Sequence, residues 1–168
     1  GRYEARTTTP RTAKGDALTQ ITEKGTDQVY NFVTQLQAAS QAQNMYNSNK
    51  FTSDLMNSYA WDTATLFLQT CGKEKYSRKT SVNNSLASRG TNSSDYTGTR
   101  DTVCNVYDMA SNIREWTTET SFDSSYPCVY RGGNYGSYNY TSDRGNNGTS
   151  SSYDSVGFRP LLFVGLNS

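Results

Sequence analysis

Apolar residues recur at three- and four-residue steps in two stretches of the chain's first half, which is the spacing of one helix face. Residues 27–46 are expected to form the first helix, with Asp27 capping its first turn. Its predicted inward face consists of Val29, Phe32, Val33, Leu36 and Ala39. The second helix is expected over residues 53–70, with Leu55, Met56, Tyr59, Ala60, Trp61, Phe67 and Leu68 inward. Both helices should pack on a sheet.

Short segments rich in β-branched and aromatic residues predict the strands of that sheet. These segments are residues 3–5, 103–109, 113–119, 128–131 and 156–164. The second and third should form a hairpin, and the first and last should pair with each other. Pro160 lacks a backbone N–H, so it places the last strand at a sheet edge or a bulge.

Between the last two predicted strands, residues 134–155 contain no aliphatic side chain. This window holds six Ser, four Asn, four Tyr, three Gly, two Thr, two Asp and one Arg. Antibody contact loops use the same types, because Tyr gives a large contact area with few rotamers while Ser, Gly and Asn adapt their hydrogen bonds. Polar tracts can also be disordered, but disordered segments are poor in aromatic residues. We therefore interpret the window as a contact surface.

The length of 168 residues suits one domain, and we expect residues 1–168 to form it. Apolar residues make up only 33% of the chain, so 13 Tyr, six Phe and two Trp should supply much of a small core. Residues 73–102 are almost without apolar side chains and predict an irregular surface region. The longest apolar run, residues 161–164, is far shorter than the ~20 residues that span a bilayer, so no membrane insertion is expected. No signal peptide is visible, but a start at Gly1 fits a part of a longer protein.

Charge and chemistry exclude several classes of function. With a net charge of +1 and scattered charges, the chain has no electrostatic footprint for nucleic acid. It has no histidine, which removes Ser-His catalysis and His-ligated zinc. Cys71, Cys104 and Cys128 have no CxxC spacing, so no zinc knuckle is indicated. A Cys104–Cys128 bridge is conceivable, but buried free thiols are favoured. We expect no metal and no cofactor.

Three blocks of the sequence together resemble one family. NVYDMASNIREWT at 105–117, VYRGGNY at 129–135 and VGFRPLL at 156–162 are similar to blocks of the sulfatase-modifying-factor, or formylglycine-generating-enzyme-like, domain. GRYEA at the start and SYAWDTA at 58–64 also fit, so the resemblance covers nearly the whole chain. Ser111 and Asn134 depart from the usual Gly and Ser. The resemblance implies an α+β, C-type-lectin-type fold with two helices packed on short antiparallel strands and much irregular loop.

The family divides by function. Its oxidases carry a reactive cysteine pair between the RGG block and the last strand, where thiolates hold copper, whereas all three cysteines of this chain precede Arg131. A histidine-based iron site, found in some relatives, is also excluded. A second branch contains the variable proteins of diversity-generating retroelements, in which a mutagenic reverse transcriptase replaces adenines in a C-terminal repeat. There, RGGSY and VGFRP bracket a window of residues reachable from Asn codons, and residues 135–155 fit that inventory.

The resemblance to this branch implies a non-enzymatic ligand-binding protein with a hypervariable surface, displayed on a phage virion or a bacterial cell. Its partner would be a protein or cell-surface receptor, with a glycan as a further possibility. The predicted contact residues are Tyr135, Ser137, Tyr138, Asn139, Tyr140, Asp143, Asn146, Asn147, Ser152, Tyr153, Asp154 and Ser155, with Arg144, Thr149 and Ser150 as fixed supports. The predicted scaffold residues are Trp116, Arg131, Gly132, Gly133, Gly157, Phe158 and Arg159.

Two other functions stay open, a formylglycine-generating-type oxidase and a carbohydrate-binding lectin. Glu115 is interpreted as the partner of Arg131 or Arg159 in the scaffold rather than as an active-site acid. Asp108 and Asn112 are expected to form an Asx turn, because calcium takes six to eight oxygen ligands and no Asp-rich loop supplies them here.

Overall fold

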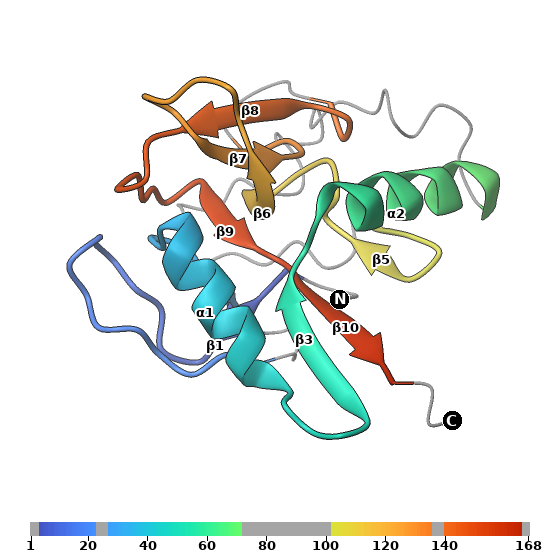
Figure 1. Ribbon diagram of the computed structural model, residues 1–168, viewed down its shortest axis with the longest axis horizontal. Coiled ribbons are helices and arrows are strands. Elements are labelled where there is room, and N and C mark those ends of the chain that lie inside the picture. The colour runs from blue at the N-terminus through green and yellow to red at the C-terminus, as the bar shows by residue number, and fades with distance from the viewer. Residues whose placement is uncertain (1–3, 23–26, 72–101, 136–139, 166–168) are drawn as a thin grey trace.

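The structure is a computed structural model that describes residues 4–22, 27–71, 102–135 and 140–165. Within these residues, helices α1 and α2 and a set of short strands are joined by long loops (Figure 1). In chain order the elements are β1 (Arg6–Thr7), β2 (Gln28–Val29), α1 (Gln35–Met45), β3 (Phe51–Leu55), α2 (Ser58–Cys71), β4 (Thr102–Val103), β5 (Val106–Tyr107), β6 (Arg114–Thr120), β7 (Cys128–Arg131), β8 (Arg144–Asn147), β9 (Val156–Phe158) and β10 (Pro160–Val164).

The largest sheet has the strand order β8-β7-β6-β9. The strand β7 is antiparallel to both β6 and β8, whereas β9 runs parallel to β6. The pairs β1–β2, β3–β10 and β4–β5 form three smaller antiparallel sheets. Since β7 precedes the window and β9 follows it, one sheet holds both ends of the window.

Among the described residues, two hydrophobic clusters fill the interior. In the first, Trp116 is completely buried and donates its Nε1–H to the Val33 carbonyl at 2.9 Å. Tyr30 and Phe158 meet there edge to face, with ring centroids 5.6 Å apart. The second cluster includes Met56, Trp61, Leu68, Val103 and Met109 and joins α2 to the β4–β5 hairpin. Both tryptophans are therefore core residues, and one of them, Trp61, lies beneath the window.

Charged side chains are also buried in the interior. The guanidinium of Arg159 donates to both carboxylate oxygens of Glu115, at 2.7–3.2 Å, and to the Tyr107 carbonyl at 2.7 Å. Arg6 lies 3.4 Å from both Glu4 and Asp108. Burial, followed by the charge of Asp108, raises the pKa of Glu4 well above its usual value. Of the two expected partners of Glu115, the structure therefore selects Arg159.

The first helix begins later than the sequence pattern predicts. Thr34 is its N-cap and forms a capping box with Gln37, in which each side chain accepts a hydrogen bond from the other residue's backbone N–H. The expected start at Asp27 is wrong, because residues 28–29 pair with β1 and Phe32 has a φ of +52°. Leu36, expected to face inward, is 79% exposed.

The second helix also starts later, at Ser58, because residues 51–55 form a strand paired with β10. The Asn57 side chain caps it by accepting from the Ala60 N–H at 2.8 Å. Trp61 and Leu68 are buried as predicted, but Tyr59 is 85% exposed and Phe67 46%.

The predicted strand pairings are wrong in two places. The hairpin is β4–β5, turning at residues 104–105, whereas β6 pairs with β7. The first strand pairs with β2 and the last with β3, although Ala5 N–H donates to the Phe158 carbonyl at 2.8 Å. The final strand divides at Arg159, and β10 begins at Pro160 in a two-stranded sheet. The irregular region expected over residues 73–102 lies, except for Thr102, outside the described residues.

Candidate functional site

The window leaves β7 through a glycine that no other residue can replace easily. Gly132 has a φ of +80°, and a Cβ there would lie 2.9 Å from the Met109 carbonyl oxygen and 3.1 Å from the Trp61 ring. Its N–H donates to the Asp143 carbonyl at 3.1 Å. Three residues later, the Tyr135 N–H donates to the Asn112 carbonyl at 2.7 Å. The first residues of the window are thereby fixed to the scaffold.

Donors from outside the window bind backbone carbonyls within it. The bonds run from Trp61 Nε1 to Thr141 O at 3.0 Å, from Asn31 Nδ2 to Asp154 O at 2.8 Å, from Phe32 N to Tyr153 O at 3.0 Å and from Arg114 N to Ser155 O at 2.9 Å. Because the acceptors are backbone atoms, these bonds do not depend on which side chains the window carries.

Part of the window is a strand, β8, that its composition did not predict. It pairs with β7 in register, with Gly145 opposite Tyr130. A Cβ on Gly145 would lie 2.4 Å from the Tyr130 ring, so the glycine leaves the space that this ring occupies. The Asn146 amide donates to Ser121 Oγ and to the Tyr126 carbonyl, each at 3.0 Å. These bonds join β8 to the loop between β6 and β7.

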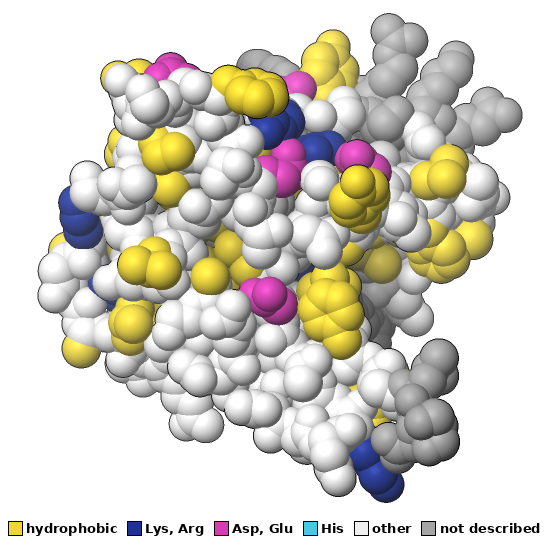
Figure 2. Space-filling view, viewed as in Figure 1, with side chains coloured by type: hydrophobic (Ala, Val, Ile, Leu, Met, Phe, Trp, Pro, Cys, Tyr) yellow, Lys and Arg dark blue, Asp and Glu magenta, His cyan; other side chains and the backbone are white. Residues whose placement is uncertain are grey.

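A row of alternating charges crosses the same sheet. Arg131 binds Asp62 at 2.6 Å and Glu119 at 3.2 Å, and Glu119 also binds Arg144 at 2.6 Å. The Arg131 guanidinium also lies 5.9 Å from the centre of the Trp61 ring. In the upper half of Figure 2, basic and acidic side chains lie next to one another over this region. The row ties β6, β7 and β8 to α2.

Tyr135 and Asp154 join the two ends of the window. The phenol donates to Asp154 Oδ2 at 2.6 Å. Burial raises the pKa of Tyr135, and the hydrogen bond and charge of Asp154 raise it further. Both side chains are half-buried, so this pair belongs at least as much to the support of the window as to its surface.

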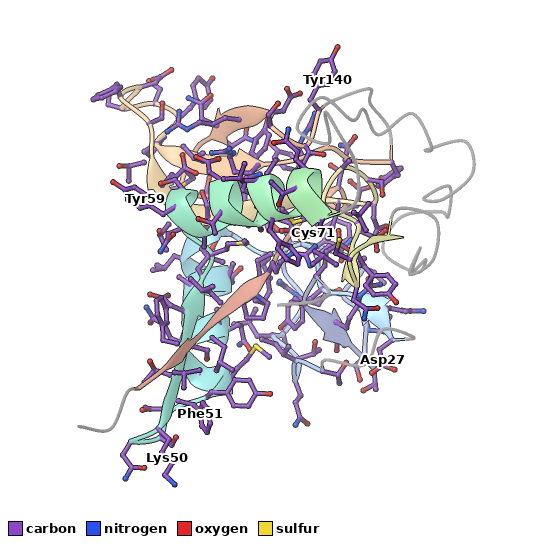
Figure 3. The ribbon with its side chains drawn as sticks, turned by 90° about the vertical axis from the view of Figure 1, so that its right-hand side faces the viewer. Asp27, Lys50, Phe51, Tyr59, Cys71 and Tyr140 are labelled. Carbon is purple, nitrogen blue, oxygen red and sulfur yellow. The ribbon has the colours of Figure 1, made fainter. Side chains whose placement is uncertain are left out.

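Two predicted contact residues, Tyr140 and Tyr153, are exposed, each at 45%. Figure 3 shows Tyr140 projecting from the surface of the molecule. Half-buried positions are taken by Tyr135, Asp143, Asn146, Asn147, Ser152, Asp154 and Ser155, and Arg144, Thr149 and Ser150 are exposed. The predicted contact residues Ser137, Tyr138 and Asn139 lie outside the described residues.

The seven predicted scaffold residues are all buried. A Cβ on Gly157 would lie 2.4 Å from Ile113 Cδ1 and 2.5 Å from the Tyr30 carbonyl oxygen, so β9 also needs its glycine. Sequence reasoning missed the roles of Asn31, Phe32 and Glu119, which no local pattern signals. Trp61 stood in a recognised block, but nothing in that block indicated its bond to the window.

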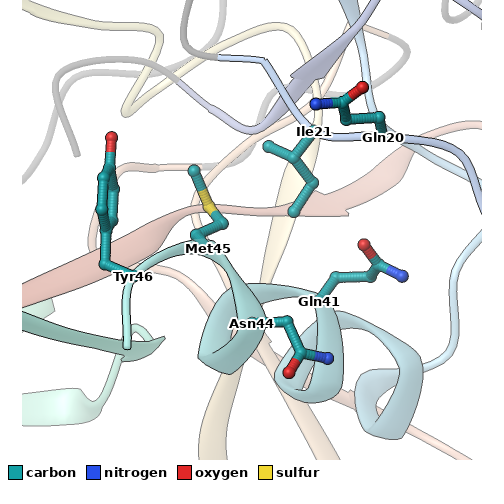
Figure 4. A pocket seen from close by; sticks show the side chains of 6 residues that line it. All are labelled: Gln20, Ile21, Gln41, Asn44, Met45 and Tyr46. Carbon is teal, nitrogen blue, oxygen red and sulfur yellow. The ribbon is translucent and has the colours of Figure 1, made fainter. Parts of the chain in front are cut away.

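The described side chains offer little reactive chemistry. No group of three or more Cys, Asp or Glu residues among them could hold a metal ion. No helix in the described part is long and apolar enough to cross a bilayer. A pocket of about 420 Å³ lies beside the C-terminal end of α1 (Figure 4), and it is lined by Gln20, Ile21, Gln41, Asn44, Met45 and Tyr46. None of these belongs to the window, and they provide no carboxylate, amine or thiol.

Comparison with solved structures places the fold. Treponema denticola variable protein 1 is similar with a TM-score of 0.62 at 14% identity, covering 96% of this chain and 82% of that protein. The crystal structure of CarF is similar with a TM-score of 0.57 at 17% identity, covering 81% of this chain and 67% of CarF. These likenesses confirm the expected α+β, C-type-lectin-type fold.

No curated protein matches the chain in sequence. A family model does match it, and this family is the one expected from the three sequence blocks. Residues 27–162 match the family described as the sulfatase-modifying factor enzyme 1-like domain. Because this range is most of the chain, the protein belongs to that family.

Proposed function

We propose that this protein is a ligand-binding protein rather than an enzyme, and that the window is its diversified contact surface for a protein or cell-surface receptor. One observation carries the proposal. Groups outside the window bind its backbone, whereas Tyr140 and Tyr153 project half of their surface into solvent. Neither phenol has a hydrogen-bond partner within the described part of the chain. A fixed backbone with free aromatic side chains is suited to recognition.

The rest of the chain supports binding over oxidation. The last cysteine is Cys128 and there is no histidine, so the segment between Arg131 and the final strand lacks the thiols on which the oxidases of this family depend. A similar structure carries the name variable protein, and the window has the residue types that adenine replacement produces from Asn codons. We propose display on a phage virion or a bacterial cell.

The test compares three matched tyrosine variants in binding to a panel of intact bacterial cells. Tyr140→Ala and Tyr153→Ala should each weaken binding to any responsive cell by roughly 5- to 150-fold, the loss expected for truncating an interface aromatic at about 1–3 kcal/mol. Tyr59, on α2 and 85% exposed, is the control, and Tyr59→Ala should leave binding unchanged. All three variants should keep the wild-type melting temperature.

Equal losses in all three variants would refute the window as the contact surface, and so would unfolding of both window variants. A glycan array with and without calcium separates the lectin alternative. The neighbouring DNA provides a second test: a near-copy of the window's coding sequence that differs mainly at adenines, beside a reverse transcriptase gene, is the expected finding. Identical windows in many sister genes would contradict diversification.

A further inference from the structure

Two cysteines far apart in the sequence meet at one end of α2. Cys71 is the last residue of this helix, and Figure 3 shows it at the opposite end from Tyr59. Cys104 lies in the turn between β4 and β5. Both thiols are free and exposed, and Cys71 is near enough to Cys104 to contribute to the raised pKa of its thiol. The third cysteine, Cys128, is buried in the core cluster beneath the largest sheet.

Core packing fixes this meeting point. Leu68, one turn before the end of α2, belongs to the same buried cluster as Val103, and Val106 packs against that cluster. The two valines face each other in the β4–β5 pairing and flank the turn that carries Cys104. The helix end and the turn are therefore held together by the hydrophobic core, whatever the oxidation state of the thiols.

The turn itself presents the thiol at a position that does not favour cysteine. Cys104 and Asn105 have φ values of +49° and +64°, as in a two-residue hairpin turn of type I′. Such turns favour Asn, Asp and Gly at both central positions, and Asn105 follows this preference. Cysteine is not among the residues that this turn favours. The backbone conformation therefore does not explain why a cysteine stands at position 104, beside Cys71.

We propose that Cys71 and Cys104 form a disulfide bond that joins the end of α2 to the β4–β5 turn, by exchange with a small disulfide such as glutathione disulfide. One cysteine thiolate attacks the small disulfide, forms a mixed disulfide and releases one glutathione thiolate. The second cysteine thiolate then attacks the protein sulfur of that mixed disulfide and releases the other glutathione. Two protein thiols are oxidised, one glutathione disulfide is reduced to two glutathione molecules, and the two protein protons pass to them.

The bond would close a loop between positions that are 33 residues apart, and so restrict the unfolded chain. Bonds of this kind persist in oxidising surroundings outside the cytoplasm, where surface-displayed proteins work. Partial desolvation of the thiol, and then the neighbouring Cys71, raise the pKa of Cys104, so exchange should accelerate as the pH rises. The inference does not involve the window, so it can fail without affecting the proposed function.

The test is thiol alkylation in denaturant after incubation with a glutathione redox buffer. Oxidised wild type should accept one alkyl group, at Cys128, whereas fully reduced protein should accept one on each of its three cysteines. Peptide mapping should show a linked pair of peptides that contain Cys71 and Cys104, about 2 Da lighter than their sum. Reduction should lower the melting temperature of the wild type by roughly 5–15 °C.

Cys71→Ser and Cys104→Ser should each abolish the linked peptide and this temperature shift, while Cys128→Ala should keep both. The wild-type mapping stands by itself if a variant does not fold. Three alkylated cysteines after oxidation would overturn the proposal. A stable mixed disulfide with glutathione, or a linked peptide that contains Cys128, would do the same.

Discussion

Removing the guanidinium of Arg159 should show how strongly the buried ion pair holds the strand that follows the window. Methionine keeps much of the apolar stem but loses the charge and the hydrogen bonds to the Glu115 carboxylate and the Tyr107 carbonyl. The side chains of Arg159 and Glu115 are each only 1% exposed. Loss of one partner from such a buried pair destabilises by about 3–5 kcal/mol, because the other charge stays buried.

Two more carboxylates increase this effect. Burial by itself lowers the pKa of Arg159, but the charges of Glu115, Glu4 and Asp108 raise this pKa above its usual value. The positive charge of Arg159 lowers the pKa of Glu4, which burial already raises well above its usual value, so removing Arg159 should raise the native-state pKa of Glu4 further. The native variant then binds more protons than its unfolded state, so its stability falls as the pH rises through that interval. The loss relative to wild type should accordingly be smaller at pH 5 than at pH 7.

Urea unfolding followed by tryptophan fluorescence measures the difference, since Trp61 and Trp116 are both buried. The matched control is Arg144→Met, which breaks an ion pair whose arginine is 46% exposed and should lose under about 1 kcal/mol. If Arg159→Met at pH 7 lost no more than this control, the buried pair would not be what secures β9, and the reasoning would fail.

Two further changes test the supports of the window. Gly157→Ala places a Cβ 2.5 Å from the Tyr30 carbonyl oxygen and should lower the free energy of unfolding in urea by roughly 1–3 kcal/mol or more. The control Gly148→Ala, whose Cβ has its nearest contact at 3.5 Å, should lower it far less. Equal losses in the two variants would contradict the packing argument. Tyr135→Phe should leave the ultraviolet titration below pH 11 unchanged, because burial and Asp154 raise the pKa of this phenol. The stability that this raised pKa contributes is fully present below about pH 10, the unfolded value, and is lost at higher pH. A titration step near pH 10 that is present in the wild type and absent in Tyr135→Phe would contradict the raised pKa of Tyr135.

The helices show what periodicity can predict. Both exist where apolar residues recur, yet each was expected several residues too early. Val29 and Phe32 fit the helical spacing, but Val29 lies in a strand paired with β1 and Phe32 has a left-handed backbone. Both conformations depend on partners far along the chain. The capping box of Thr34 and Gln37 was the local signal for the true start. Periodicity predicted that a helix forms here but not its inward face, since Leu36 is exposed and the buried residues are Ala38 and Ala42. Capping chemistry determined where the helix begins.

Within the window, composition predicted a surface but could not divide its tyrosines. Tyr135 and Tyr140 are chemically identical, and only the position of Asp154 makes the first a bonded support while the second is exposed. The strand β8 was also invisible, because Arg-Gly-Asn-Asn has low β propensity and pairs through the space that Gly145 leaves for Tyr130. These features depend on tertiary contacts, which a single segment of sequence does not encode.

The same division limits how freely the window can vary. At Tyr153 the scaffold binds the carbonyl, so a new side chain leaves that bond intact. At Asn146 the side-chain amide itself binds Ser121 and the Tyr126 carbonyl. Adenine replacement in an Asn codon gives residues such as Ser, Gly and Tyr, and none of these side chains carries an amide. If the window is diversified as proposed, a change at Asn146 would loosen β8, whereas a change at Tyr153 would alter the proposed contact surface alone. A protein that varies both positions must hold the window mainly through its backbone, and the bonds from Trp61, Asn31 and Arg114 do so.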